Sequence, residues 1–310
     1  MIDLRRLQVL RAVAYYGTVT AAARALHLTP SAASQQVKQL GKDLGVALLE
    51  PNGRTIRLTG AAHSLLAHAD AIEARWQQAE GELSGDDGLP AGLLRMAGFP
   101  TAMCRLLAPV TATLGKAYPA LRVRLRETET AHCFDLLFNG SIDLAVVETV
   151  QSNPPACDRR FEQHPLLDDP FDLLVAADHR LAGRRTVELH EVAGEPWIMG
   201  AEGDTSRAQV LSACSTAGFS PDITHEAFGL TVIASLVDLG LGVALVPRLS
   251  QIQPEVDVRR IPISGTAPSR KFLTATRRGG RSTPAVAAAL EALDERARSL
   301  TAEAECVAAR

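Results

Sequence analysis

The sequence predicts a multi-domain α+β protein, with a small helical domain at the N-terminus and a larger α/β part after it. Three observations support this prediction. Two short helical patterns and an alternating strand fill residues 1–60, a helical pattern with a heptad seam follows, and strands alternate with helices from about residue 92. A Gly- and Asp-rich break over residues 84–91 indicates a hinge before the α/β part.

Residues 18–44 predict two helices separated by a tight turn. Thr18 or Thr20 is expected to cap the first helix, while Thr29 caps the second and Pro30 takes its first position. An apolar stripe runs along the second helix at Ala33, Val37, Leu40 and Leu44. The polar residues turned away from that stripe are Ser31, Ser34, Gln35 and Lys38. This pattern is typical of a helix-turn-helix whose second helix reads base edges in the major groove, the alternative being a helical pair with a solvated face.

A wing is predicted after this pair. A turn sequence, Pro51-Asn52-Gly53-Arg54, leads into the alternating strand Thr55–Leu58. Arg54 and Arg57 are expected to reach phosphates or a minor groove. Residues 1–60 carry a net charge of +5 and the remaining residues −8, so a basic module lies in a chain whose net charge is −3.

The run AAARALHLTPSAASQQVKQLGKDLGVALLE followed by GRTIRLTGA resembles the winged helix-turn-helix of LysR-type transcriptional regulators. The shared features are the Ala-Ala pair, the Thr-Pro-Ser-Ala-x-Ser-x-Gln start, the Leu-Gly after the helix and the Arg-x-x-x-Leu-Thr exit. Two departures occur. This chain has Leu49-Glu50-Pro51 where the family commonly has Phe-x-Arg, and Ala61-Ala62 where it has Ala-Gly.

A helix is predicted from an N-cap at Thr59 to about Leu83. Its apolar positions follow the a/d spacing of a coiled coil, at Leu65, Ala69, Ile72, Trp76, Ala79 and Leu83. Such a seam is expected to pair with a second copy, packing against the chain's own body being the alternative. The resemblance favours the dimer, because family members pair through this linker helix.

The C-terminal part, residues 92–303, predicts two α/β lobes. An internal echo supports this division, because a helix, a glycine stop and a strand occur at residues 136–147 and again at 236–246. We expect lobe I at about 92–163 and 270–303, and lobe II at about 164–269. A closing helix is predicted from Thr283-Pro284, with one face formed by Val286, Leu290, Leu293, Ala297 and Leu300.

Two such lobes around a cleft are the architecture of periplasmic solute-binding proteins, and the C-terminal part resembles the effector domain of the LysR-type family. The motifs that carry this resemblance include Gly140-Ser141-Ile142-Asp143-Leu144-Ala145 and Gly240-Leu241-Gly242-Val243-Ala244-Leu245-Val246-Pro247. Ligands in such folds lie beyond the carboxyl ends of strands. The expected effector contacts are Pro100, Thr101, Ala102, Thr128, Glu148, Thr149, Ala201 and Phe228. An anionic effector is expected, since a helix N-terminus is electropositive.

Other classes of protein find little support. The sequence contains no secretory signal pattern and no apolar run long enough for a membrane span, so a cytoplasmic protein is expected. Five cysteines without a C-x-x-C pattern predict small buried side chains. No catalytic residues, metal ligands or cofactor site are predicted, because the chain has no G-x-G-x-x-G, P-loop, G-x-S-x-G or complete H-E-x-x-H. A ligand-independent architectural DNA binder would leave the two-lobed part without a purpose.

We therefore interpret the sequence as a LysR-type transcriptional regulator that is not an enzyme. The expected partners are double-stranded promoter DNA, further copies in a homodimer or homotetramer and a small-molecule effector between the lobes, with RNA polymerase as a candidate partner. The effector would act by binding one assembly state of the protein more tightly than another, which shifts the balance between the two states.

Overall fold

The computed structural model describes residues 4–52, 55–66, 68, 89–150, 153–155, 158, 160–265 and 267–309. Contacts divide the chain into two compact units. The first comprises residues 1–147, 152–164 and 274–296, and the second residues 148–151, 165–273 and 297–310. We call the first unit from residue 89 onward lobe I and the second unit lobe II. The predicted α+β organisation, with an N-terminal helix-turn-helix before a two-lobed α/β domain, is confirmed.

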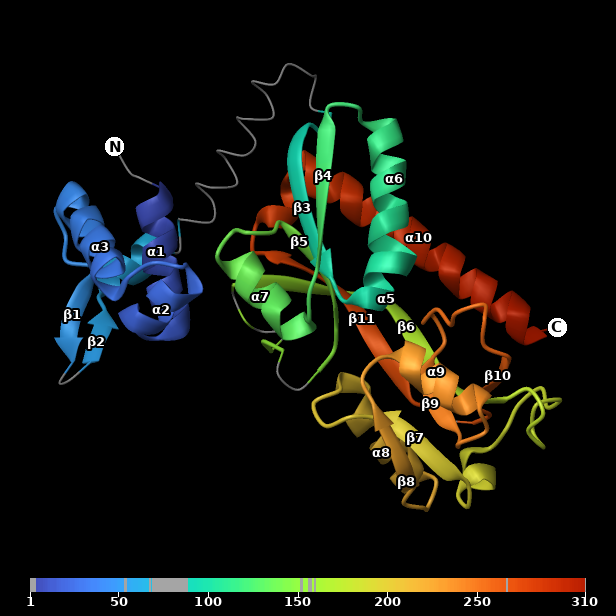
Figure 1. The fold of residues 1–310 in the computed structure, drawn as a ribbon. Coiled ribbons are helices and arrows are strands. Elements are labelled where there is room, and N and C mark those ends of the chain that lie inside the picture. Colours follow the sequence, from blue (N-terminus) through green and yellow to red (C-terminus); the bar gives the residue numbers. More distant parts are fainter. Residues whose placement is uncertain are drawn as a thin grey trace. The chain divides into compact units, whose positions relative to one another are not determined.

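The N-terminal domain is built from three helices and a two-stranded wing (Figure 1). The helices are α1 (Leu4–Tyr16), α2 (Val19–Ala25) and α3 (Pro30–Leu44). Both predicted caps form, since the hydroxyl oxygens of Thr18 and Thr29 accept hydrogen bonds from the backbone N–H groups of Ala21 and Ala32. The apolar stripe of α3 packs into the core of this domain, with Leu44 at its edge.

The turn between α2 and α3 contains a strained residue. His27 has a φ of 55°, and it is the one non-glycine residue in the described part of the chain with a positive φ. A side chain in this left-handed conformation costs about 1–3 kcal/mol. The packing of α2 on α3 through Ala22, Ala23 and Ala33 therefore stabilises the turn enough to offset the conformational cost at His27.

The wing consists of β1 (Leu49–Asn52) and β2 (Thr55–Leu58), which pair antiparallel. The sequence predicted only the second of these strands. A helix follows from residue 60, and Thr59 caps it by accepting a hydrogen bond from the N–H of Ala62. Of the predicted linker seam, Leu65 is described, half-buried against the N-terminal core. The other five seam positions, Ala69, Ile72, Trp76, Ala79 and Leu83, lie outside the described residues.

Lobe I contains three parallel strands in the order β5-β3-β4. The elements are β3 (Gly92–Gly98), α5 (Pro100–Ala102), α6 (Ala108–Ala117), β4 (Leu121–Glu127), α7 (Thr130–Phe138), β5 (Leu144–Glu148) and the first half of α10 (Pro284–Ala309). The last residue of β5, Glu148, and the residues of α10 from Ala297 onward belong to lobe II. The strand expected after Gly140 in the internal echo is β5, which begins at Leu144 because Ile142 and Asp143 belong to the preceding turn. The five residues predicted for the buried face of the closing helix are all buried in α10.

The segment from Pro100 to Ala117 is helical, but a π-helical turn at Met103–Leu107 interrupts the α-helix. Pro109 has no N–H to donate to the carbonyl of Arg105, four residues earlier, so the regular helix cannot continue through this point. Instead, the Arg296 Nε of α10 donates to that carbonyl at 3.2 Å.

Lobe II packs short strands and helices around a core that includes Trp197, Phe171 and Leu173. Its elements are η2 (Leu189–Val192), β7 (Pro196–Gly200), α8 (Thr205–Thr216), β8 (Asp222–Ala227), α9 (Leu230–Asp238), β9 (Ala244–Pro247) and β10 (Val258–Pro262). Two long strands, β6 (Phe161–Ala176) and β11 (Ser269–Arg277), contribute residues to both units. Gly140 and Gly240, the glycines of the internal echo, both have positive φ and end α7 and α9. None of the helices in the described ranges is long and apolar enough to cross a bilayer.

Candidate DNA-binding and effector-binding sites

The first turns of α3 expose the residues predicted to contact DNA. Thr29, Pro30, Ser31, Gln35 and Lys38 are exposed, and Ser34 is half-buried. The hydroxyls of Thr29 and Ser31 lie 3.1 Å apart, so the capping residue also touches the polar face. Hydroxyl and amide groups at a helix start can donate to and accept from base edges, which is the chemistry that a recognition helix needs.

Basic side chains of this domain differ in their surroundings. Arg57 donates from Nε and Nη2 to Glu50 Oε1, at 2.9 and 2.6 Å. Arg6 pairs with Asp43, which also accepts a hydrogen bond from Gln39. Arg54, the other predicted wing contact, lies outside the described residues.

In lobe I, the predicted effector residues follow the carboxyl ends of β3 and β4. Pro100 is exposed, Thr101 and Thr128 are half-buried, and Ala102 is fully buried, so Ala102 offers only backbone groups. Phe99, the residue before Pro100, provides no side-chain cap to the helix. The backbone N–H groups at this helix start therefore have no carboxylate or hydroxyl of the capping residue before them.

Glu148 is the last residue of β5, and Thr149 follows it directly. Glu148 is 5% exposed and lies 3.7 Å from Arg270, whose Nη2 also pairs with Asp169 at 2.9 Å. Burial raises the pKa of Asp169, and the charge of Arg270 opposes this shift. Thr149 is exposed, and its N–H donates to the carbonyl of Lys271. Glu148 is thus part of a buried ion cluster, which sequence spacing did not reveal.

In lobe II, Ala201 follows β7 and Phe228 follows β8. Phe228 is 74% exposed, the largest exposed fraction among the large apolar side chains described. The helix start beside Ala201 already holds a carboxylate, because Asp204 caps α8 by accepting from the N–H and hydroxyl of Ser206. A Cβ at Gly200 would lie 2.6 Å from the Asp204 carboxyl carbon, so glycine is required for this cap.

Arg207 ties the carboxyl ends of β7 and β8 together. Its Nη1 donates to the carbonyl of Gly200 at 2.6 Å and lies 2.7 Å from Glu226 Oε1. This positive charge is therefore shared between two acceptors of the same lobe. Neither Asp204 nor Arg207 was identified from the sequence, although an Asp directly before a helix is a recognisable capping signal.

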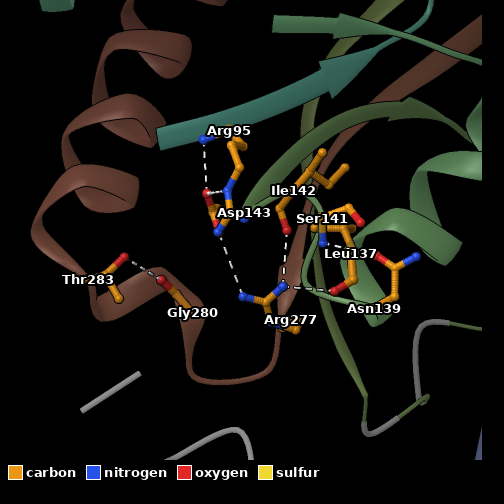
Figure 2. Close-up of polar contacts among 9 residues, drawn as sticks. All are labelled: Arg95, Leu137, Asn139, Ser141, Ile142, Asp143, Arg277, Gly280 and Thr283. Atoms are coloured by element: carbon orange, nitrogen blue, oxygen red, sulfur yellow. Dashed lines mark hydrogen bonds and ion pairs between the residues drawn. The ribbon is translucent and has the colours of Figure 1, made fainter. Parts of the chain in front are cut away.

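Asp143, the last residue of the Gly-Ser-Ile-Asp motif of lobe I, is buried and forms a polar anchor, whose contacts Figure 2 shows. Asp143 accepts three hydrogen bonds from Arg95, through the backbone N–H, Nε and Nη2, at 2.9–3.1 Å. The Arg277 guanidinium lies 3.7 Å from the same carboxylate and donates to the carbonyls of Leu137 and Ile142. One carboxylate thereby joins β3, the α7–β5 turn and β11.

The cysteines only partly match the sequence prediction. Cys133 and Cys214 are buried, whereas Cys104 is exposed and the prediction is wrong there. Burial raises the pKa of Cys133 to about 12 and that of Cys214 to about 11, so both are thiols near neutral pH. The side chains of Cys157 and Cys306 lie outside the described part. Within the described residues, no group of His, Cys, Asp and Glu is arranged to hold a metal ion.

Comparisons with known proteins agree with this architecture. Residues 4–63 match the bacterial regulatory helix-turn-helix of the LysR family, and residues 87–298 match the LysR substrate binding domain. The RuBisCO operon transcriptional regulator of Allochromatium vinosum is 30% identical over 302 residues, which cover 96% of this chain and 97% of that protein.

Two OxyR proteins are also similar. The DNA-binding transcriptional dual regulator OxyR of Escherichia coli K12 is 28% identical over 82% of this chain and 81% of its own. A solved full-length OxyR variant from Pseudomonas aeruginosa superimposes with a TM-score of 0.62 at 26% identity, over 96% of this chain and 95% of its own.

The fold and the two sites therefore define a two-domain transcriptional regulator with a DNA-binding and an effector-binding part. The chain belongs to the LysR family. It is a DNA-binding regulator and not an enzyme, and its family binds promoter DNA as oligomers that respond to small-molecule effectors.

Proposed function

We propose that α3 reads the bases of a promoter site and that the wing contacts its phosphates. The observation that carries this proposal is the exposed polar start of α3, capped by Thr29 and lined by Ser31, Gln35 and Lys38. Ser34 lies one turn from Ser31 on the same helix. Base edges give sequence information and phosphates do not, so these two groups of contacts should respond differently to substitution.

Gln35→Ala tests the base contact. Loss of hydrogen bonds to a base edge should cost about 1–3 kcal/mol on the promoter duplex upstream of the gene, and much less on a random duplex. Lys42→Ala is a control from the last turn of the same exposed helix. Equal losses on both duplexes for Gln35→Ala would contradict base reading. Fluorescence anisotropy measures the affinities of the wild type and both variants for the two duplexes.

We further propose that the C-terminal domain binds an anionic effector through the helix start at Pro100-Thr101-Ala102. Support comes from the contrast between two helix starts. The one after β3 has no side-chain cap, whereas the one after β7 holds the carboxylate of Asp204. An electropositive helix start without its own anion favours an external one. Thr128, which follows β4 in the same lobe, would add a hydrogen-bonding group.

Thr101→Ala tests the effector site. Losing a hydrogen bond to a charged group should weaken the response by about 1.5 kcal/mol or more, while DNA affinity without effector stays unchanged. Thr113→Ala is the matched control, since its hydroxyl donates to the carbonyl of Pro109 in the same helical segment. The readout is promoter footprinting with a panel of mono- and dicarboxylates, and of amines for comparison. A footprint that shifts with amines alone would refute the anionic assignment.

The relatives named as peroxide-inducible activators suggest a second candidate, a peroxide response through a cysteine. Cys133 and Cys214 do not favour it, because burial keeps both as thiols, whereas Cys104 is exposed. We favour a bound effector, because residues 87–298 match a substrate binding domain. We also propose that the protein acts in the cytoplasm, where promoter DNA lies, as a dimer or tetramer.

A further inference from the structure

The charged pair on the wing has a consequence for DNA binding. We propose that Glu50 restrains Arg57 and so lowers affinity for DNA of any sequence, which makes Glu50 a specificity-determining residue. This inference rests on the proposed placement of the wing at the DNA backbone. The two residues have different roles. Arg57 would bind phosphate, and Glu50 competes with phosphate for the Arg57 guanidinium.

The geometry places the two side chains directly opposite each other. Glu50 and Arg57 are register partners across β1 and β2. The Nε and Nη2 groups of Arg57 both donate to Oε1 of Glu50. Nε and one terminal nitrogen form one of the edges with which a guanidinium binds phosphate bidentately, so the carboxylate occupies an edge that DNA could use.

The pair is open to solvent and therefore exchangeable. The side chains of Arg57 and Glu50 are 68% and 41% exposed. Exposed ion pairs contribute little to stability and are weakened by salt. A phosphate can therefore displace the carboxylate, and until it does so the carboxylate competes with it for Arg57. The restraint acts on DNA affinity without being needed for the fold.

The composition of the wing increases the weight of this one pair. Pro51 stands where the family commonly has arginine and carries neither a charge nor an N–H. From Gly45 to Gly60 the cationic residues are Arg54 and Arg57, and the acid is Glu50. One of two wing cations is thus paired within the chain before DNA arrives.

The restraint acts more strongly on random DNA than on the promoter. Binding to random DNA consists of phosphate contacts, so each restrained arginine lowers it directly. On the promoter, base contacts of α3 fix the register and hold the wing beside the backbone, so the exchange becomes intramolecular and more favourable. Glu50 therefore raises the ratio of specific to non-specific affinity.

The test uses the full-length protein, a random duplex and the promoter duplex, with affinities measured from 50 to 200 mM NaCl. Glu50→Gln should bind random DNA more tightly. The slope of log affinity against log salt concentration should become steeper by about 0.9 per wing, which corresponds to an additional loss of roughly threefold in affinity per wing between about 50 and 200 mM NaCl. The promoter-to-random ratio should fall by a similar factor. Asp43→Asn, which releases Arg6 away from the wing, is the matched control.

The double variant decides whether Arg57 is the cause. In an Arg57→Gln background, Glu50→Gln should leave the salt dependence unchanged. If the double variant gains as much as Glu50→Gln alone, the effect is general charge and the proposal fails. Weaker binding of both duplexes by Glu50→Gln would also overturn it, because Glu50 would then orient Arg57 for DNA. If the wild type does not prefer the promoter, base reading by α3 fails, while the slope on random DNA still decides the restraint.

Discussion

Asp143→Asn should lower the free energy of unfolding of lobe I by about 2–4 kcal/mol. Asparagine keeps the shape of the side chain but removes the charge that lies between Arg95 and Arg277. Breaking a buried ion pair costs about 3–5 kcal/mol, because the remaining charge is left without compensation. Arg95 is one-third exposed, so water screens its share, and Arg277 keeps two carbonyl acceptors. For these two reasons the expected loss, about 2–4 kcal/mol, is smaller than the general range of about 3–5 kcal/mol.

The assay is urea unfolding of the full chain followed by far-UV circular dichroism, together with hydrogen exchange of peptides from β3 and β11. Asp257→Asn is the control, because Asp257 also pairs with an arginine, Arg259, but is highly exposed. Its loss should stay within about 0.5 kcal/mol. The anchor argument fails if the two variants unfold at the same urea concentration and β3 exchanges equally fast in both.

Three further predictions concern other parts of the chain. His27→Gly should raise the free energy of unfolding of the N-terminal domain by about 0.5–1 kcal/mol, since glycine relieves a positive φ at some entropic cost, and a lower melting temperature would contradict this. Iodoacetamide at pH 8 should label Cys104 rapidly in the native protein and Cys133 and Cys214 only after unfolding, as peptide mass spectrometry would show, and equal labelling would contradict the assigned burial. Ile72→Asp should separate the predicted linker pair, because a buried charge would face its symmetry mate, and an unchanged sedimentation coefficient would instead indicate packing within the chain.

Local features of this fold could be predicted from short stretches of sequence. Thr29 and Pro30 define the start of α3 because a hydroxyl cap and a missing N–H act within one helical turn. Gly140 and Gly240 end helices because their backbones adopt a positive φ. In each case the residues that interact are neighbours in the chain, so the physical cause is visible in the sequence.

Contacts between distant residues could not be predicted in the same way. Asp143 meets Arg277, and Glu148 meets Arg270, only after the strands of the α/β domain have formed. The chain contains many acids and arginines, and no spacing rule selects these partners. Pro109 did carry a local signal, since a proline inside a helical pattern interrupts the regular hydrogen bonding of the helix. The hydrogen bond from Arg296 to the Arg105 carbonyl, however, depends on the packing of α10.

The charge of the N-terminal domain illustrates the same limit. Its net charge of +5 predicts DNA binding, but net charge does not show which basic side chains are exposed and available to DNA. Arg11 is buried, and Arg6 and Arg57 pair with Asp43 and Glu50. The exposed cations outside these pairs include Arg24, Lys38 and Lys42, of which the two lysines lie on α3 itself. Two exposed lysines therefore lie on the recognition helix, while the described wing arginine, Arg57, is held in an ion pair within the chain.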